Sequence, residues 1–106
     1  MSEFIFRAVP EMVEYFSDMA DEMVQRFGIS RAEAVARINE SWKDDTFDSF
    51  PHILCHEFPE HWAYLIYYGD VPYWDEDADR STWVASDPPP ADSPAWTLPR
   101  EPEQRD

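Results

Sequence analysis

A short central segment, PHILCHEFPEHW at residues 51–62, concentrates the side chains with the most reactive chemistry. It holds all three histidines and the only cysteine of the chain, together with two glutamates: His52, Cys55, His56, Glu57, Glu60 and His61. Imidazole and thiolate groups are the ligands that zinc prefers, so the segment contains enough ligand types for a tetrahedral site. A small metal-dependent enzyme built on the histidines and the cysteine is therefore one hypothesis.

The spacing of these histidines does not match a hydrolase motif. Zinc proteases place two histidines four residues apart on one helix face, with a glutamate between them. Here His56 and His61 are five residues apart, a step that turns a helix by about 140°, and Pro59 disfavours a continuous helix between them. A looser site through His52 and His56 stays open.

The alternative is that this segment is structural. Cys55 is then a small buried residue, and His56 and Glu57 make local hydrogen bonds. Adjacent cysteine and histidine side chains seldom point at each other, so a thiolate nucleophile has little support. We expect no bound metal, no cofactor and no catalytic residue.

The charge of the chain restricts its partners. Eight Lys and Arg residues stand against 23 Asp and Glu residues, which gives a net charge of −15 and a pI of about 4.2. A protein that binds nucleic acid needs a basic face, so we expect no nucleic-acid partner. An acidic surface can be attracted to a basic protein by long-range electrostatics, although acids also serve simply to keep a small protein soluble.

Length and hydropathy indicate one small domain that stays in the cytoplasm. The chain of 106 residues is within the usual size of a single domain. It has no apolar run near the roughly 20 residues that span a bilayer, and its N-terminus, MSEFIFRAVPEM, carries acids where a signal peptide is basic. We expect no membrane partner.

Helical periodicity is clearest at residues 10–27. Apolar residues recur at helical spacing and form one face, which consists of Met12, Phe16, Met19, Ala20, Met23 and Phe27. Pro10 suits the first turn, and Gly28 favours the left-handed conformation that ends a helix. This pattern predicts a helix from Pro10 to Phe27.

A second helix is expected immediately afterwards. Ser30 is a suitable N-cap, Glu33 has the spacing of a capping box, and the apolar pattern fails near Lys43. The residues expected to face inward are Ala34 or Val35, Ile38 and Trp42.

A third helix is expected from Pro59 to the stop at Gly69. Its inward residues would be Trp62, Leu65 and Ile66, and the loop before it should bury Phe47 and Phe50. Residues 62–68, WAYLIYY, are also rich in aromatic and branched side chains, so a strand is the alternative there.

The C-terminal residues 87–106 differ in composition from the rest. They contain six of the ten prolines, which excludes a helix or a central strand and indicates an extended or partly disordered tail. The expected fold is therefore mainly α: a single-domain bundle of about three helices over residues 1–86, followed by this proline-rich tail.

Aromatic residues gather between Phe58 and Trp74, next to a run of acids. We assign Phe58 and Trp62 to the core, which leaves more aromatic side chains than a small core can hide. Tyrosine and tryptophan are frequent anchors at protein interfaces. The candidate partner-binding residues are Tyr64, Tyr68, Tyr73 and Trp74, with an acidic rim of Asp70, Asp75, Glu76, Asp77 and Asp79. The alternative is that the aromatic residues only cover the core.

A scattered set of residues forms one further pattern, which consists of Arg37-Ile38-Asn39 with Trp42, His56-Glu57, Pro59-Glu60, Trp62-Ala63, Tyr67-Tyr68-Gly69 and Trp74. Through this pattern, which covers about half of the chain, the sequence resembles small bacterial proteins, some of which are similar to immunity proteins encoded beside secreted toxins. The resemblance implies inhibition by binding and supplies no catalytic residue.

These observations lead to one expected function and two alternatives. The expected function is an acidic protein-binding module that neutralises a basic protein, with a cognate toxin as the partner. The alternatives are the metal-dependent enzyme described above and an adaptor subunit of a larger complex.

Overall fold

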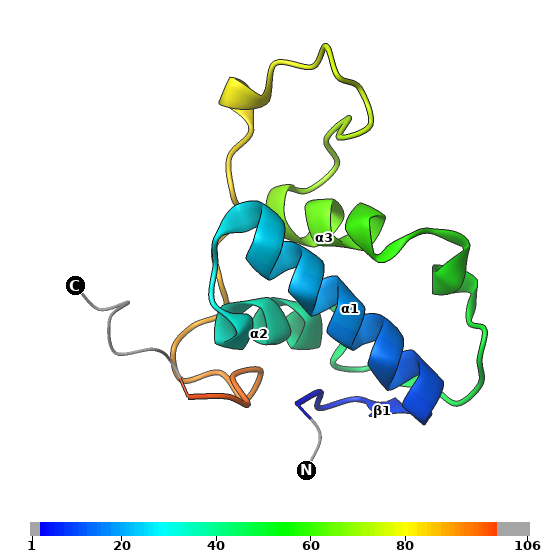
Figure 1. Cartoon of the computed structure of the whole chain (residues 1–106). Coiled ribbons are helices and arrows are strands. Elements are labelled where there is room, and N and C mark those ends of the chain that lie inside the picture. Colours follow the sequence, from blue (N-terminus) through cyan, green and yellow to red (C-terminus); the bar gives the residue numbers. More distant parts are fainter. Residues whose placement is uncertain (1–2, 100–106) are drawn as a thin grey trace.

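The computed structural model describes residues 3–99, the side chain of Ile53 excepted, and confirms a mainly α fold (Figure 1). The helices are α1 (Pro10–Phe27), α2 (Arg31–Trp42) and α3 (Pro59–Tyr68). The two-residue strands β1 (Arg7–Ala8) and β2 (Thr46–Phe47) pair in parallel. Two short 3-10 helices, η1 (Ile53–His56) and η2 (Arg80–Thr82), complete the order.

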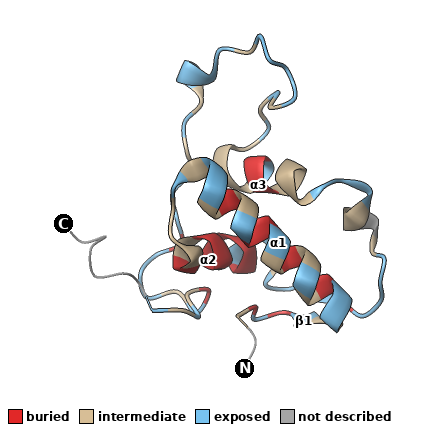
Figure 2. Cartoon of the chain, in the orientation of Figure 1, coloured by how far each residue is buried: buried red, intermediate tan, exposed pale blue. Residues whose placement is uncertain are grey.

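Helix α1 lies between the other two helices and packs against both. Its predicted apolar face is buried, with Met12, Phe16 and Met23 fully inaccessible to solvent, while its other face is exposed (Figure 2). The helix ends as expected, because Gly28 has a φ of 70° and donates its N–H to the carbonyl of Val24. Residues with a Cβ rarely adopt that backbone conformation.

Helix α2 also has the predicted start, since the hydroxyl of Ser30 accepts a hydrogen bond from the N–H of Glu33 at 3.1 Å. The expected inward residues Ala34, Val35 and Ile38 are fully buried, and Trp42 is half-buried. Glu33 does not close a capping box in the observed contacts. Its carboxylate instead pairs with Arg37, one turn later, at 2.8 Å.

Residues 59–68 form a helix, so the strand alternative is wrong. Trp62 and Ile66 pack against the core as expected, but Leu65 is 38% exposed and Ala63 and Tyr64 are buried in its place. The helix is therefore rotated from the expected orientation. Its buried face points at the end of α1, where the ring of Tyr64 meets Phe27 edge-on at 5.2 Å.

Two phenylalanines assigned to the core lie outside it. Phe47 is buried among Phe6, Phe16 and Trp42, as expected, but Phe50 is 52% exposed. These rings contact Phe47 directly, whereas Phe50 lies in the loop that follows β2.

Phe58 is 81% exposed because it is the N-cap of α3. Its extended backbone, with φ −70° and ψ 154°, turns the side chain away from the buried helical face.

The described part of the proline-rich tail, residues 87–99, contains no helix or strand and folds back along α2 towards the N-terminus (Figure 1). Ala95 is 1% exposed and Pro89 is buried. The indole N–H of Trp96 donates to the carbonyl of Pro89 at 3.1 Å, and the hydroxyl of Thr97 donates to the carbonyl of Glu3. Residues 100–106 of the expected tail lie outside the described residues.

The fully buried amide of Asn39 joins the two ends of the described chain to α2. Its Oδ1 accepts from the N–H of Ile5 at 2.9 Å, and its Nδ2 donates to the carbonyls of Glu3 at 3.1 Å and Ala95 at 2.9 Å. A polar side chain that is 0% exposed is stable only when its groups are paired in this way.

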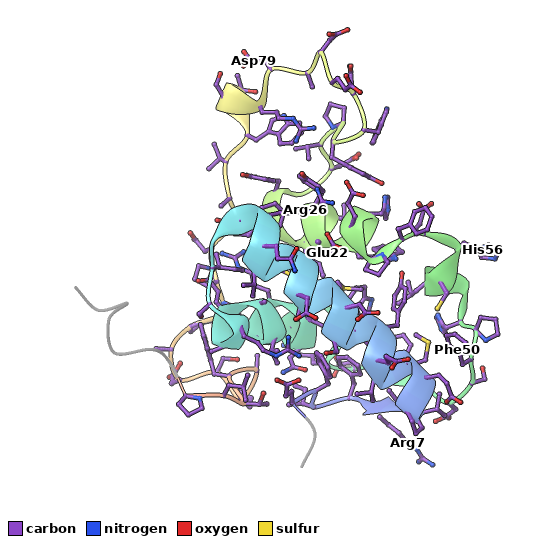
Figure 3. The ribbon with its side chains drawn as sticks, in the orientation of Figure 1. Arg7, Glu22, Arg26, Phe50, His56 and Asp79 are labelled. Atoms are coloured by element: carbon purple, nitrogen blue, oxygen red, sulfur yellow. The ribbon has the colours of Figure 1, made fainter. Side chains whose placement is uncertain are left out.

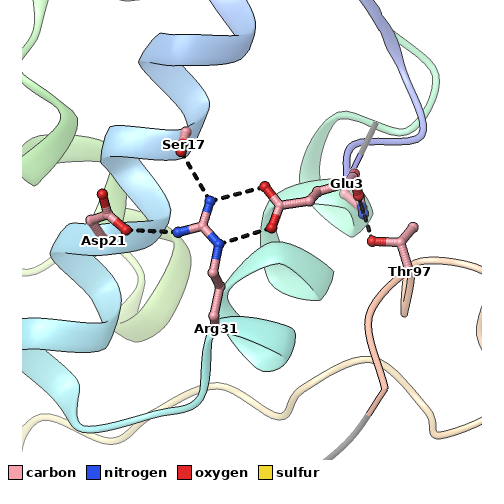
Figure 4. A network of polar contacts seen from close by, with 6 residues as sticks. Glu3, Ser17, Asp21, Arg31 and Thr97 are labelled. Carbon is pink, nitrogen blue, oxygen red and sulfur yellow. Dashed lines mark hydrogen bonds and ion pairs between the residues drawn. The ribbon is translucent and has the colours of Figure 1, made fainter. Parts of the chain in front are cut away.

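Arg31 makes a second connection, between the N-terminal segment, α1 and α2 (Figure 4). Its guanidinium donates to both carboxylate oxygens of Glu3 at 2.8 and 2.9 Å, to Asp21 at 2.7 Å and to Ser17 at 2.9 Å. The hydrogen bonds from Arg31 hold the pKa of Glu3 below its ordinary value. The two-oxygen contact is the strong geometry for an arginine–carboxylate pair.

Removal of the Asn39 amide should destabilise the fold strongly. We expect Asn39→Ala to lower the free energy of unfolding by about 2–4 kcal/mol, because a buried N–H and two carbonyls lose their partner. The matched control is Glu40→Ala at the next position, where an exposed pair with Lys43 is worth less than about 1 kcal/mol. Urea unfolding measures both changes, and equal effects of the two substitutions would show that the amide does not hold the ends of the chain.

The Glu3–Arg31 pair should make stability depend on pH in the acid range. Because the pKa of Glu3 is lower in the folded state, the unfolded state binds more protons, and stability rises with pH. We expect Glu3→Gln to be less stable than the wild type at neutral pH and the difference to shrink as the pH falls below the ordinary value of 4.5. Urea titrations over the acid range measure this, with the exposed Glu11→Gln as the control. A gap that is constant with pH would contradict the ionic role.

Candidate protein-binding surface

The structure gathers most of the predicted partner-binding residues on one projecting loop. Residues 70–85, which we call the arm, leave the C-terminal end of α3, extend away from the helices and return at Ser86 (Figure 1). Most of the arm is exposed (Figure 2). Loops longer than about 12–15 residues with little regular structure are uncommon in compact domains and are usually either functional segments or disordered linkers.

Aromatic contacts attach the arm to α3. The ring of Tyr73 stacks on the buried ring of Tyr64, with centroids 4.9 Å apart and planes 10° from parallel. The hydroxyl of Tyr73 lies 3.2 Å from Nδ1 of His61. On the returning side, Trp83 meets Tyr68 at 5.5 Å. Both sides of the arm are therefore fixed on the same helix.

Arg80 connects the two sides of the arm to each other. Its Nη2 donates to the carbonyl of Tyr73 at 2.7 Å, and its guanidinium carbon lies 4.6 Å from the centre of the Trp83 ring and 5.8 Å from that of Tyr64. Stacking of a guanidinium on aromatic rings is favourable and keeps its planar group in one orientation. Arg80 was not among the predicted site residues. It is the only basic residue within the arm, a signal that could have been noticed.

At the base of the arm, Ser86 connects α3 to α2. Its N–H donates to the carbonyl of Tyr67 at 2.8 Å, and its hydroxyl lies 3.0 Å from the same carbonyl. Arg37 donates to the hydroxyl and the carbonyl of Ser86, each at 2.9 Å, and its guanidinium lies over the ring of Tyr67. The side chain of Arg37 is 4% exposed, so this arginine has a structural role. Arg37 and Pro88–Pro90 are among the residues that line a hollow of about 290 Å³.

Two acids shape the turn at the tip of the arm. Oδ1 of Asp75 accepts from the N–H of Asp77 at 2.9 Å, and Oδ1 of Asp79 accepts from the N–H of Ser81 at 3.1 Å and from the Ser81 hydroxyl. The hydrogen bonds from Ser81 lower the pKa of Asp79 below its ordinary value. Asp79 lies at the far end of the arm (Figure 3).

The predicted aromatic anchors separate into supporting and exposed residues. Tyr64 is 8% exposed and so is not a surface anchor, because its ring is enclosed between α1 and the arm. Tyr68 and Tyr73 are half-buried and carry the stacking contacts, whereas Trp74 is 67% exposed. Trp74 is thus the one of the four whose ring is largely free for a partner.

All five acids of the predicted rim are exposed. Within residues 3–99 none of them forms an ion pair with a basic side chain, and they are Asp70, Asp75, Glu76, Asp77 and Asp79. Five of the six basic residues in the described range pair with acids outside the arm: Arg7, Arg26, Arg31, Arg37 and Lys43. The sixth is Arg80. The negative charge of the arm is therefore mostly uncompensated.

The histidines have separate surroundings. Nδ1 of His52 accepts from the N–H of Leu54 and caps η1, and His61 contacts Tyr73 and lies 3.8 Å from Glu57. His56 is exposed and points outward (Figure 3). Across the described residues, no group of three His, Cys, Asp or Glu side chains is placed to hold a metal ion.

Local contacts hold the remaining part of this segment. The hydroxyl of Tyr15 on α1 lies 2.9 Å from the carbonyl of Leu54 and 2.8 Å from that of Glu57, and burial raises the pKa of Tyr15 to about 12. Cys55 is half-buried rather than fully buried, with its sulfur 3.7 Å from that of Met12. These contacts tie η1 to α1 and fix the start of α3.

Comparisons with known proteins add no relative of this chain. No protein-family model, no curated protein and no solved structure matches it.

None of the helices within residues 3–99 combines the length and the apolar character needed to cross a membrane.

Proposed function

We propose that this chain is an acidic protein-binding module that neutralises a basic protein, and that it acts as a cytoplasmic immunity protein of a secreted bacterial toxin. In this proposal the chain has no catalytic residue and binds no cofactor, nucleic acid or membrane. Its activity is to cover a functional surface of the partner.

One observation carries the proposal: the exposed ring of Trp74 lies on a braced arm whose five acids have no basic partner within the described residues. Binding affinity at protein interfaces is concentrated in a few aromatic anchors, and surrounding charges mainly accelerate encounter. The stack of Tyr73 on Tyr64 and the contacts of Arg80 hold the arm before a partner arrives. A pre-organised loop loses less conformational entropy on binding.

The acidic character selects the class of partner. A net charge of −15 repels nucleic acids and other acidic proteins and attracts a cationic protein. Many toxins that act on nucleic acids must themselves be basic, so an acidic inhibitor can occupy the surface that the nucleic acid would use. The resemblance to immunity proteins agrees with this inference.

An adaptor would use the same surface, and inhibition distinguishes the two roles. The experiment is to purify the basic protein encoded beside this gene and measure its activity with increasing amounts of this chain. We expect complete inhibition at a stoichiometric ratio. Tight binding that leaves the partner fully active would instead identify an adaptor.

The anchor and the rim of the arm should affect binding kinetics differently. We expect Trp74→Ala to cost about 2 kcal/mol or more, mainly through faster dissociation, because a desolvated contact is lost. Neutralising Asp75, Glu76 and Asp77 as amides should mainly slow association, because these charges act before contact. Surface plasmon resonance with the basic partner separates the two rates.

The control substitutions for this experiment are at exposed residues outside the arm. Asp44 and Asp45 form a similarly exposed acidic pair after α2, and their change to Asn should alter association less than the change in the arm. Phe50→Ala removes an exposed aromatic side chain outside the arm and should leave dissociation unchanged. If the control variants have effects as large as those in the arm, the partner binds elsewhere.

Loss of Arg80 should loosen the arm without unfolding the helices. We expect Arg80→Met to keep the helical circular dichroism signal and to speed amide hydrogen exchange at residues 73–83, because the link between the two sides of the arm is lost. Arg80→Lys keeps the charge but not the planar group, so it should restore little protection. Unchanged exchange in both variants would contradict the bracing role of Arg80.

A further inference from the structure

We infer that the binding surface continues from the arm onto the outer face of α3, and that it accepts an amphipathic basic helix of the partner. This inference rests on the proposed function and names the kind of segment that the partner presents. We call this continuation the outer surface and define it by Phe58, His61, Leu65 and Trp74.

The outer surface is unusually apolar for an exposed region of such an acidic chain. Within residues 3–99, six large apolar side chains are exposed, and three of them belong to it: Phe58 at 81%, Leu65 at 38% and Trp74 at 67%. The α-helical rise places Phe58 and Leu65 about 10 Å apart along α3. Contiguous exposed apolar groups on a soluble protein commonly mark an interaction site.

A shared hollow joins three of these residues, and helical spacing adds the fourth. His61 and Leu65 are one turn apart on α3, and with Trp74 and Tyr73 they line a hollow between the helix and the arm. Phe58 precedes His61 by three residues and Leu65 by seven, the spacing that places side chains on one side of a helix. The hollow has a volume of about 20 Å³, which is too small for a small-molecule ligand and is suited to the tip of one side chain.

The local secondary structure favours a helical segment as the occupant. Peptides that bind as added strands need an exposed sheet edge, and the strands of the described residues are two residues long. An exposed helix face with apolar residues about two turns apart instead suits a second helix laid across it.

Charge decides between a partner and a second copy of this chain. Glu57, Asp70 and Asp75 are exposed around the outer surface, so two copies brought together there would place like charges against one another. Lysine or arginine residues beside the apolar face of a partner helix would pair with these acids. The occupant is therefore a basic amphipathic helix from a different protein.

The test uses a labelled synthetic peptide of about 18 residues, long enough to form a helix, with leucines along one helical face and lysines and arginines elsewhere. Fluorescence anisotropy measures its binding to the full chain up to about 1 mM. We expect binding that Phe58→Ala with Leu65→Ala weakens at least about tenfold, and that Phe50→Ala with Ile5→Ala, outside both the arm and the outer surface, changes by less than about twofold. A peptide of the same composition with its leucines spread around the helix should bind at least about tenfold more weakly.

Each other outcome overturns the inference in a recognisable way. Equal binding of the two peptides would refute the outer surface and leave the proposed function standing. The same conclusion would follow if the Phe58 and Leu65 changes had no effect while amide replacements in the arm still weakened binding. Failure of the peptide to bind at all would refute the inference, and inhibition of the basic partner would then decide the proposed function separately. A wild-type dimer in sedimentation that the Phe58 and Leu65 changes dissociate would identify a second copy as the occupant. Circular dichroism checks that each variant is folded.

Discussion

The packing of the Tyr64 ring between α1 and the arm is the interaction on which the position of the arm depends. This ring makes a T-shaped contact with Phe27 at the end of α1 and is stacked on the ring of Tyr73. The guanidiniums of Arg26 and Arg80 lie 5.7 and 5.8 Å from its centre. The same side chain therefore closes the helical core and supports the arm. The backbone hydrogen bonds within the arm join residues only two or three positions apart, so the contacts with Tyr64 are needed to hold its two sides together.

A second constraint is the excess of negative charge. The chain has few basic residues, and four of those in the described range connect segments distant in sequence: Arg7, Arg26, Arg31 and Arg37. Arg31 binds the N-terminal segment to α1, and Arg37 holds Ser86 against α2. Little positive charge is left for the arm, where Arg80 faces aromatic rings. The negative potential of the arm is thus a consequence of how the scarce basic residues stabilise the fold.

The sequence predicted those parts of the fold that depend on nearby residues, such as the ends of helices, better than those that depend on packing between distant segments. The bounds of α1 and the cap of α2 were predictable because Pro10, Gly28 and Ser30 act on the backbone next to them. The rotation of α3 was not, because its ten residues are apolar or aromatic on nearly every side and periodicity cannot select a face. The exposure of Phe50 depends on which other rings fill the core, and that of Phe58 on the extended backbone at the N-cap of α3.

The candidate site, like the fold, was predicted from the sequence only where composition or local pattern was informative. Composition identified the acidic and aromatic region, and the structure places most of it on one arm. The separation of Tyr64 from Trp74 depends on packing between α1, α3 and the arm, which no local pattern encodes. Arg80 binds Tyr73, which lies 7 positions earlier, and His61 contacts Tyr73 across 12 positions. Neither contact follows from a local sequence pattern, so the roles of Arg80 and His61 were recognised only in the folded structure.

The central claim is that an exposed acidic arm attracts and binds a basic protein. The most direct measurement is the association rate of the wild-type chain with that protein as the salt concentration rises from about 10 to about 500 mM, over which the Debye length falls from about 30 Å to a few ångströms. The account predicts that the association rate falls by at least about tenfold while the dissociation rate changes much less. An association rate that stays constant over this range would contradict it.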